Sequence, residues 1–247
     1  MRVNGLVLGI VAALSLMSPV RAADKAQKGE TQRHTVEIKV EPQQWQIRRS
    51  ETAKAFNAYY GSGSKDKAAA DKVDAILTNL EKTPWSFTPM EAIDIYGAFY
   101  VPNEGDKHMG SLLQMVSMFA IAGLYDANRF ADASGRAEIM NNESFLRRPF
   151  TLGGEAGVKQ LVDFLQQHPK EAEAAVLAGA DKAAKFVEKA QYDVHWPTAY
   201  GLTRMSCAAE GKKNCPPPPA LPKEKWGQAF SEAVQTVKRY YRDNSKK

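Results

Sequence analysis

The chain has 247 residues, 33 of them basic and 28 acidic, and a formal net charge of +5. This length is sufficient for one large domain or two small ones with a real hydrophobic core. Basic and acidic residues are interspersed along almost every expected helix, which is typical of a solvated surface. Because no basic stripe with interleaved aromatic residues occurs, the sequence argues against nucleic acid as a partner.

The first 22 residues have the pattern of a secretory signal peptide. Arg2 supplies a positive n-region, Gly5 to Met17 form an apolar h-region, and the following residues place cleavage before Ala23. The alternative is a transmembrane anchor, for which the apolar run is short. No later segment is expected to span a membrane. We therefore predict a periplasmic protein with a mature charge near +3, because two arginines leave with the signal.

Residues 23–247 are predicted to form a single helical domain with a disordered N-terminal segment. Residues 23–33 are polar, whereas Thr35 to Val40 alternate with period two, as a half-buried strand does. This is the one strand that the pattern favours, and it would need a partner in the fold or on another protein. The alternative, an extended segment lying on the helices, stays open.

The most apolar part of the sequence is Ser111 to Ala131. Gly110 precedes it, and Ser111 with Gln114 has the form of a capping box. From Leu112 to Tyr125 only Gln114 and Ser117 are clearly polar, and a helix that is apolar on nearly every side is buried on nearly every side. The fold class predicted is therefore all-α, a bundle of about eight helices around this buried central helix.

The other helices are predicted from apolar spacing and from start and stop signals. Thr88-Pro89-Met90-Glu91 is the clearest start, and that helix should end before Pro102. Two polar loops, 103–110 and 141–154, should flank the central helix. The remaining predicted helices are Ser50–Tyr60, Asp66–Glu81, Glu155–Gln167, Lys170–Gln191, Pro197–Met205 and Lys223–Arg242.

The sequence lacks three common catalytic or cofactor-binding motifs. It has no His-Glu-x-x-His, no Gly-x-Ser-x-Gly and no phosphate-binding glycine loop, so we expect a non-enzyme without cofactor or metal. Ser62 to Lys65 fits Ser-x-x-Lys, but a flexible linker explains the Gly-Ser run better. The alternative function is a periplasmic helical hydrolase acting on cell wall or lipid, with Glu91 or Glu104 as the acid.

The two cysteines, Cys207 and Cys215, are close in sequence and belong to a chain with an export signal. A disulfide between them is expected in an oxidising compartment. Two sulfurs without a nearby histidine pair do not make a zinc site, and the spacing is not that of a Cys-x-x-Cys redox motif.

One family resemblance is carried by the segments after the central helix. Ala122-Gly123-Leu124-Tyr125-Asp126-Ala127, the loop Phe150 to Gly154, and Gly157 to His168-Pro169 resemble the Tai-type immunity proteins of type VI secretion. The chain departs from the family in its greater length and in lacking a cysteine near Phe150. The resemblance covers under a third of the mature chain. It implies a periplasmic inhibitor that binds a toxin, a cell-wall amidase or another envelope-targeting enzyme.

An inhibitor of this kind is expected to bind through loops that project from a rigid scaffold. A cognate toxin is the expected partner, and whether the chain also forms a homodimer stays open. The second loop combines arginine with an aromatic residue, the mixture found at binding hot spots. The residues predicted to bind the partner are Glu104, Asp106 and His108 in the first loop and Arg147, Arg148 and Phe150 in the second.

Overall fold

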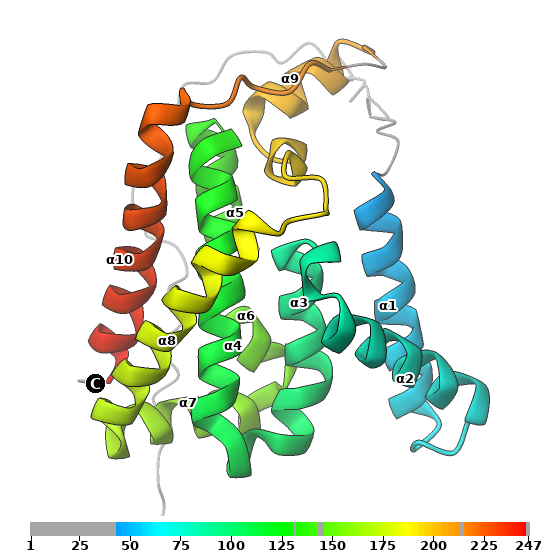
Figure 1. Ribbon diagram of the computed structural model, residues 1–247. Coiled ribbons are helices and arrows are strands. Elements are labelled where there is room, and N and C mark those ends of the chain that lie inside the picture. The colour runs from blue at the N-terminus through cyan, green and yellow to red at the C-terminus, as the bar shows by residue number, and fades with distance from the viewer. Residues whose placement is uncertain (1–42, 131, 143–145, 213–214, 246–247) are drawn as a thin grey trace, which may run out of the picture. The chain divides into compact units, whose positions relative to one another are not determined.

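The computed structural model describes residues 43–130, 132–142, 146–212 and 215–245, all within the unit Glu37–Lys247. The predicted signal peptide, its cleavage site and the Thr35–Val40 strand lie outside these residues. Throughout the described ranges every regular element is a helix (Figure 1), which confirms the all-α prediction.

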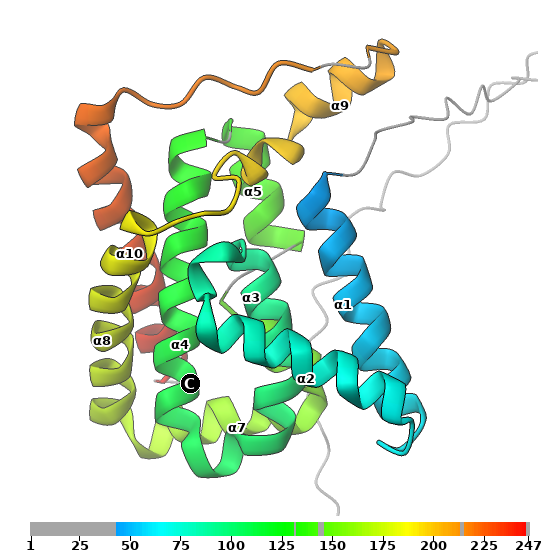
Figure 2. The same cartoon turned by 45° about the vertical axis from the view of Figure 1, so that its right-hand side comes forward.

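Helix α4, Val101–Phe130, is the central element that the apolar run predicts (Figure 1). Leu113, Val116 and Ile121 are fully buried, and helices pack on it from both sides (Figure 2). The helical stretch Pro89–Phe130 is long and apolar enough to cross a membrane, but 72% of its most apolar window is buried inside the fold. Burial of this kind is also found in the core helix of a soluble protein.

The predicted loop 103–110 is wrong, because the chain is already helical there. Helix α3 (Pro89–Ile95) continues through a π-helical segment, Tyr96–Tyr100, directly into α4. Pro102 lies within this continuous helix, and the Ala98 carbonyl oxygen four residues before it accepts a hydrogen bond from the Tyr60 hydroxyl at 2.9 Å. Within α4, His108 has non-helical angles, φ −134° and ψ 28°, so the helix kinks at this residue and then continues.

On one side of α4 lie α1 (Gln44–Gly61), α2 (Lys67–Lys82) and α3 (Figure 2). Helix α1 starts before the predicted Ser50, because Gln43 and Gln46 form a capping box and Trp45 is buried. The predicted capping box at Thr88 is confirmed, with Glu91 bonded to the Thr88 backbone N–H at 2.8 Å.

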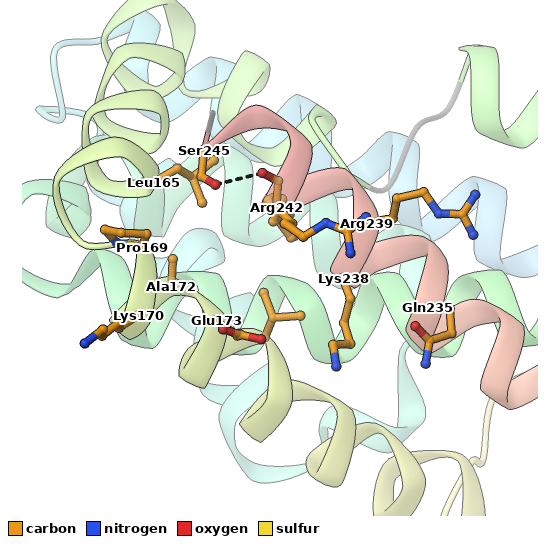
Figure 3. A pocket seen from close by; sticks show the side chains of 12 residues that line it. Leu165, Pro169, Lys170, Ala172, Glu173, Gln235, Lys238, Arg239, Arg242 and Ser245 are labelled. Carbon is orange, nitrogen blue, oxygen red and sulfur yellow. Dashed lines mark hydrogen bonds between the residues drawn. The ribbon is translucent and has the colours of Figure 1, made fainter. Parts of the chain in front are cut away.

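On the other side lie α8 (Pro169–Glu188) and α10 (Trp226–Asn244) (Figure 1), whereas α7 (Gly154–Gln167) crosses the start of α4 (Figure 2). The Ala-rich α8 approaches α4 closely, since a Cβ at Gly179 would lie 2.7 Å from the Gln114 carbonyl oxygen. A pocket opens between α8 and α10 near the C-terminal end of α10 (Figure 3).

Shorter helices connect these elements. The prediction of a loop over 141–154 is wrong for its second half, which forms α6, and α5 has no predicted counterpart. Helix α9 corresponds to the second half of the predicted helix Pro197–Met205. The short elements are α5 (Ala133–Asn142), α6 (Arg148–Leu152), the 3₁₀ turns Pro84–Ser86, Trp196–Ala199 and Lys223–Lys225, and α9 (Leu202–Ala209).

Candidate functional site

Helix α9 carries the two most exposed large apolar side chains among the described residues. None of its residues is buried, and Leu202 and Met205 are 63% and 56% exposed. A disulfide joins Cys207 to Cys215, with Cα atoms 5.8 Å apart, and Pro216 to Pro219 follow. We call Leu202, Met205 and this disulfide the α9 surface. Figure 2 shows α9 lying beyond the end of α4.

The predicted disulfide is thus present, and it is compatible with an oxidising, periplasmic or secreted location. Its cysteines are eight positions apart in the sequence, so the loop that the bond closes is short. We expect the double variant Cys207→Ser/Cys215→Ser to lose at most about 2–3 kcal/mol of unfolding free energy. Urea denaturation measures the loss, and a larger loss would show that the disulfide holds more than α9 in place.

A hydrogen-bond cluster fixes the start of α9 on the start of α5. Asp132 accepts bonds from the Ser134 hydroxyl and the Gly135 N–H, both at 2.6 Å, and from the Thr203 hydroxyl. The Leu202 N–H donates to Ser134 Oγ at 2.8 Å. Burial alone would raise the pKa of Asp132, but these bonds outweigh it and lower the pKa to about 2. The cluster therefore holds α9 in a defined position at neutral pH.

Gly201 is required at this junction. Its φ is +98°, and a Cβ there would lie 2.6 Å from Asp132 Oδ1 and 2.7 Å from the Gly135 nitrogen. We expect Gly201→Ala to destabilise the protein by about 2 kcal/mol or more, from the backbone conformation and the clash together. Gly63→Ala is the matched control, because Gly63 also has a positive φ but has open space around it. If Gly201→Ala and Gly63→Ala lowered the unfolding temperature equally, the clash at Gly201 would contribute nothing to the loss.

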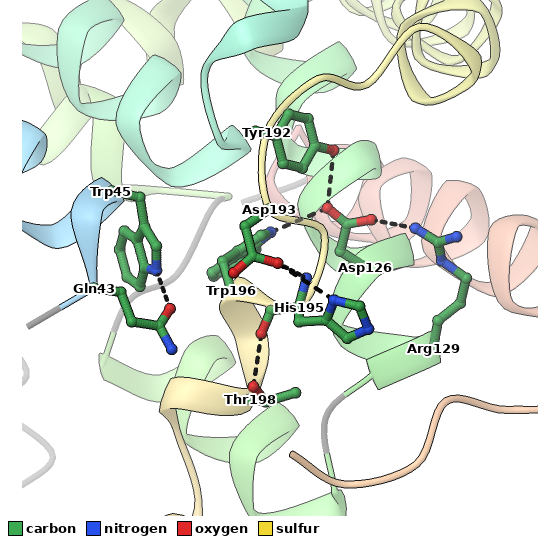
Figure 4. Close-up of polar contacts among 9 residues, drawn as sticks. All are labelled: Gln43, Trp45, Asp126, Arg129, Tyr192, Asp193, His195, Trp196 and Thr198. Carbon is green, nitrogen blue, oxygen red and sulfur yellow. Dashed lines mark hydrogen bonds and ion pairs between the residues drawn. The ribbon is translucent and has the colours of Figure 1, made fainter. Parts of the chain in front are cut away.

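A pocket of about 290 Å³ lies beside the α9 surface. His195 and Asp193 line it, with His195 Nδ1 3.3 Å from Asp193 Oδ1 and both side chains about half exposed. The Thr198 hydroxyl donates to the His195 carbonyl oxygen and not to its ring (Figure 4). These contacts do not form a nucleophile–base–acid chain. The other lining residues are Gln43, Thr203, Arg204, Cys215, Pro216, Pro217 and Pro218.

Near this pocket, a buried carboxyl group joins α4 to the segment before α9 (Figure 4). Asp126 is fully buried and accepts bonds from Arg129 Nη2 at 2.6 Å, the Tyr192 hydroxyl at 2.9 Å and Trp196 Nε1 at 3.0 Å. The Arg129 guanidinium also lies over the Tyr125 ring, 3.9 Å from its centroid. With three donors on one carboxyl group, Asp126 fixes the segment that leads into α9.

The same burial makes stability depend on pH. Desolvation raises the pKa of Asp126 from 3.8 to about 6, against the opposing effects of Arg129 and the other donors. The folded protein therefore keeps this proton when the unfolded chain has lost it. This bound proton contributes about 3 kcal/mol to the free energy of unfolding below about pH 4. The contribution is lost as the pH rises from about 4 through about 6. We expect the stability difference between the wild type and Asp126→Ala to shrink over that window. A difference in unfolding free energy that urea denaturation finds constant from pH 4 to 7 would contradict the raised pKa.

The residues predicted in the first loop lie on α4 instead. Glu104, Asp106 and His108 are all exposed, in the first turns of the helix and at its kink. They are not gathered in a projecting loop, because the chain is helical there. Their side chains are available to a partner, and the prediction that they bind one stays a prediction.

The structure corrects the prediction that Arg148 and Phe150 of the second loop, 141–154, bind a partner. Phe150 is fully buried, so it belongs to the core and offers no surface to a partner. Arg148 Nε bonds Asp94 Oδ1 at 2.6 Å and ties α6 to α3. Arg147 is exposed and precedes α6. Arg148 and Phe150 therefore hold α6 against the rest of the fold. Arg147 alone of the three is exposed.

The acid residues considered for a hydrolase have other partners. Glu91 is buried, and Arg48 binds it through two bonds of 2.9 and 3.0 Å. Glu104 is exposed on α4, so the structure places the two carboxyl groups in unlike environments. No group of three or more His, Cys, Asp or Glu residues that could hold a metal ion occurs in the described part of the chain.

Sequence reasoning missed the importance of Asp126, Asp132 and the pair Leu202 and Met205. A signal for Asp126 was present, since an acidic residue interrupts an otherwise apolar helix end. The exposure of Leu202 and Met205 had no sequence signal, because apolar residues at this spacing usually face a core. Comparison with known proteins found no matching family model, no matching curated protein and no matching solved structure.

Proposed function

We propose that this chain is a binding protein of the periplasm that inhibits a secreted antibacterial enzyme, as an immunity protein does. The observation that carries the proposal is the α9 surface. Two large apolar side chains there are more than half exposed on a short helix whose start is held by hydrogen bonds and whose Cys207 is joined to Cys215 by a disulfide. An exposed apolar feature on a rigid support is typical of a protein–protein contact site.

The way α9 is held supports this proposal. The Asp132 cluster and Gly201 fix its start, and the disulfide fixes the segment that follows it. A binding element fixed before it meets its partner has less conformational entropy to lose on association. The segment that leads into α9 is in turn tied to α4 through Asp126 and Trp196.

The chemistry around the α9 surface favours a binding role. The neighbouring His195 and Asp193 are exposed, and no hydroxyl nucleophile is bonded to the histidine ring among the described residues. The carboxyl group of Glu91 is bound by Arg48. Within residues 43–130, 132–142, 146–212 and 215–245, no contact favours the alternative of a helical hydrolase.

The test is to co-purify this protein with the enzyme encoded beside its gene. We expect a stable complex in size-exclusion chromatography and loss of the enzyme's activity when the two proteins are mixed. The same chromatography on the isolated protein tests whether the chain also forms a homodimer. Full enzyme activity in the presence of an excess of this protein would contradict the proposal.

A further inference from the structure

The chain between α9 and α10 contains an extended, proline-rich stretch, residues 216–222, which we call the proline segment (Figure 1). Each proline fixes its own φ near −65° and disfavours helix at the residue before it, so the segment is held extended. Pro222, with φ −53° and ψ 142°, is close to the polyproline II conformation. Every residue of the segment is exposed except Pro218, which is half-buried.

Contacts at both ends hold the proline segment in place. Cys215, directly before it, is joined to Cys207 of α9 by the disulfide. Near its other end, the Leu221 N–H donates to the Arg129 carbonyl oxygen at 2.9 Å. Between these points, residues 216–220 make no hydrogen bond within the part of the chain that the structure describes. The segment is therefore a surface that is ordered before a partner arrives and has little conformational entropy to lose on binding.

The proline segment and α9 form two walls of the 290 Å³ pocket described above. Pro216 to Pro218 line it from the segment, and Thr203 and Arg204 line it from α9. Arg204 is half-buried, and among the described residues it forms no ion pair or hydrogen bond. The His195 and Asp193 side chains, both about half exposed, supply polar groups to the same pocket.

The chemistry of these walls selects one kind of side chain. Proline rings pack on the faces of aromatic rings, which is how aromatic-lined sites recognise polyproline II segments. A guanidinium group without an ion pair, such as that of Arg204, also stacks on an aromatic face. The polar tip of a tyrosine or tryptophan finds hydrogen-bond partners in His195 and Asp193. An acidic side chain would instead meet the apolar prolines and the Asp193 carboxylate.

We propose that the partner inserts an aromatic side chain, a tyrosine or a tryptophan, between the proline segment and α9. Its ring packs on Pro216 to Pro218 and meets the Arg204 guanidinium. This inference rests on the proposed function, because the partner is the inhibited enzyme, and it names the chemistry by which that enzyme is recognised. The insertion point adjoins the α9 surface, since the disulfide of that surface lies directly before Pro216.

The experiment is calorimetric titration of the protein with the purified enzyme encoded beside its gene. Arg204→Met keeps the apolar stem but loses the guanidinium, and it should weaken binding about fivefold. Pro217→Gly/Pro218→Gly removes two rings and loosens the segment, and it should weaken binding about tenfold or more. Pro169→Ala, which changes an exposed proline at the start of α8, is the matched control and should change nothing. Circular dichroism confirms that the variants fold, and Arg204→Met decides alone if the glycine variant does not.

Photo-crosslinking from Pro219→p-benzoylphenylalanine identifies the enzyme segment that lies on the prolines. We expect it to contain a tyrosine or tryptophan whose replacement by alanine is coupled to Arg204→Met in a double-mutant cycle. Crosslinks to a segment without an aromatic residue, or independent effects of the two substitutions, would overturn the inference. A complex that both Arg204→Met and the glycine variant leave at wild-type affinity overturns this inference alone, whereas no complex at all overturns the proposed function with it.

Discussion

Replacing Asp126 with alanine is expected to lower the free energy of unfolding by at least about 3 kcal/mol at pH 5. The substitution removes the acceptor for Arg129, Tyr192 and Trp196 together. Each buried donor left without a partner costs about 1–3 kcal/mol, and the lost side chain also leaves a cavity. Because Asp126 is completely buried, water cannot replace these bonds without opening the structure.

Urea denaturation followed by circular dichroism measures this loss. The matched control is Asp71→Ala, since Asp71 forms an exposed pair with Lys67 at 3.1 Å and should contribute less than about 1 kcal/mol. Tyr192→Phe removes a single donor without a large cavity and should cost about 1 kcal/mol. If Asp126→Ala were no more destabilising than Asp71→Ala, Asp126 would not be the centre that links α4 to the segment before α9.

The central helix could be predicted from the sequence because its signal is composition, which depends little on neighbours. From Leu112 to Tyr125 an apolar run needs burial wherever it lies, and α4 is buried there. The start of α3 was predicted equally well, since Thr88, Pro89 and Glu91 interact locally. These features do not require knowledge of the tertiary structure.

The start of α4 could not be predicted, because tertiary packing decides it. Residues Asn103 to Gly110 are polar and contain two glycines, which is typical of a loop. In the structure Gly105 instead lets Gln160 of α7 approach, since a Cβ there would overlap Gln160 Oε1. The glycine therefore serves helix packing rather than a turn.

The site was harder to predict than the fold for a related reason. Phe150 and Arg148 look like a binding pair in sequence, but Phe150 fills the core and Arg148 binds Asp94. Leu202 and Met205 look like core residues, but they are exposed. A single sequence shows how apolar residues are spaced along a helix. It does not show which of these side chains another element of the fold covers.

We expect Leu202→Ser/Met205→Ser to weaken binding to the inhibited enzyme about 100-fold. Apolar anchors at the centre of an interface cost about 2 kcal/mol or more each when they are truncated, and the two effects need not add fully. Because both side chains are more than half exposed in the free protein, the double variant should keep its thermal stability. Calorimetry with the purified enzyme measures the affinity.

Two control variants make this prediction specific. Leu177→Ser changes a 43% exposed leucine on α8 and should leave the affinity unchanged. Arg147→Ala tests the loop that the sequence favoured without breaking the Arg148–Asp94 pair, and it should also have little effect. If Arg147→Ala weakens binding and the α9 double variant does not, the interface lies beside α6.

Hydrogen exchange of the free protein and of its complex with the enzyme tests the role of the α9 surface most directly. We expect complex formation to slow exchange most strongly in α9, Leu202–Ala209. Unchanged exchange in α9, together with protection around Glu104 to His108 or beside Arg147, would contradict this account.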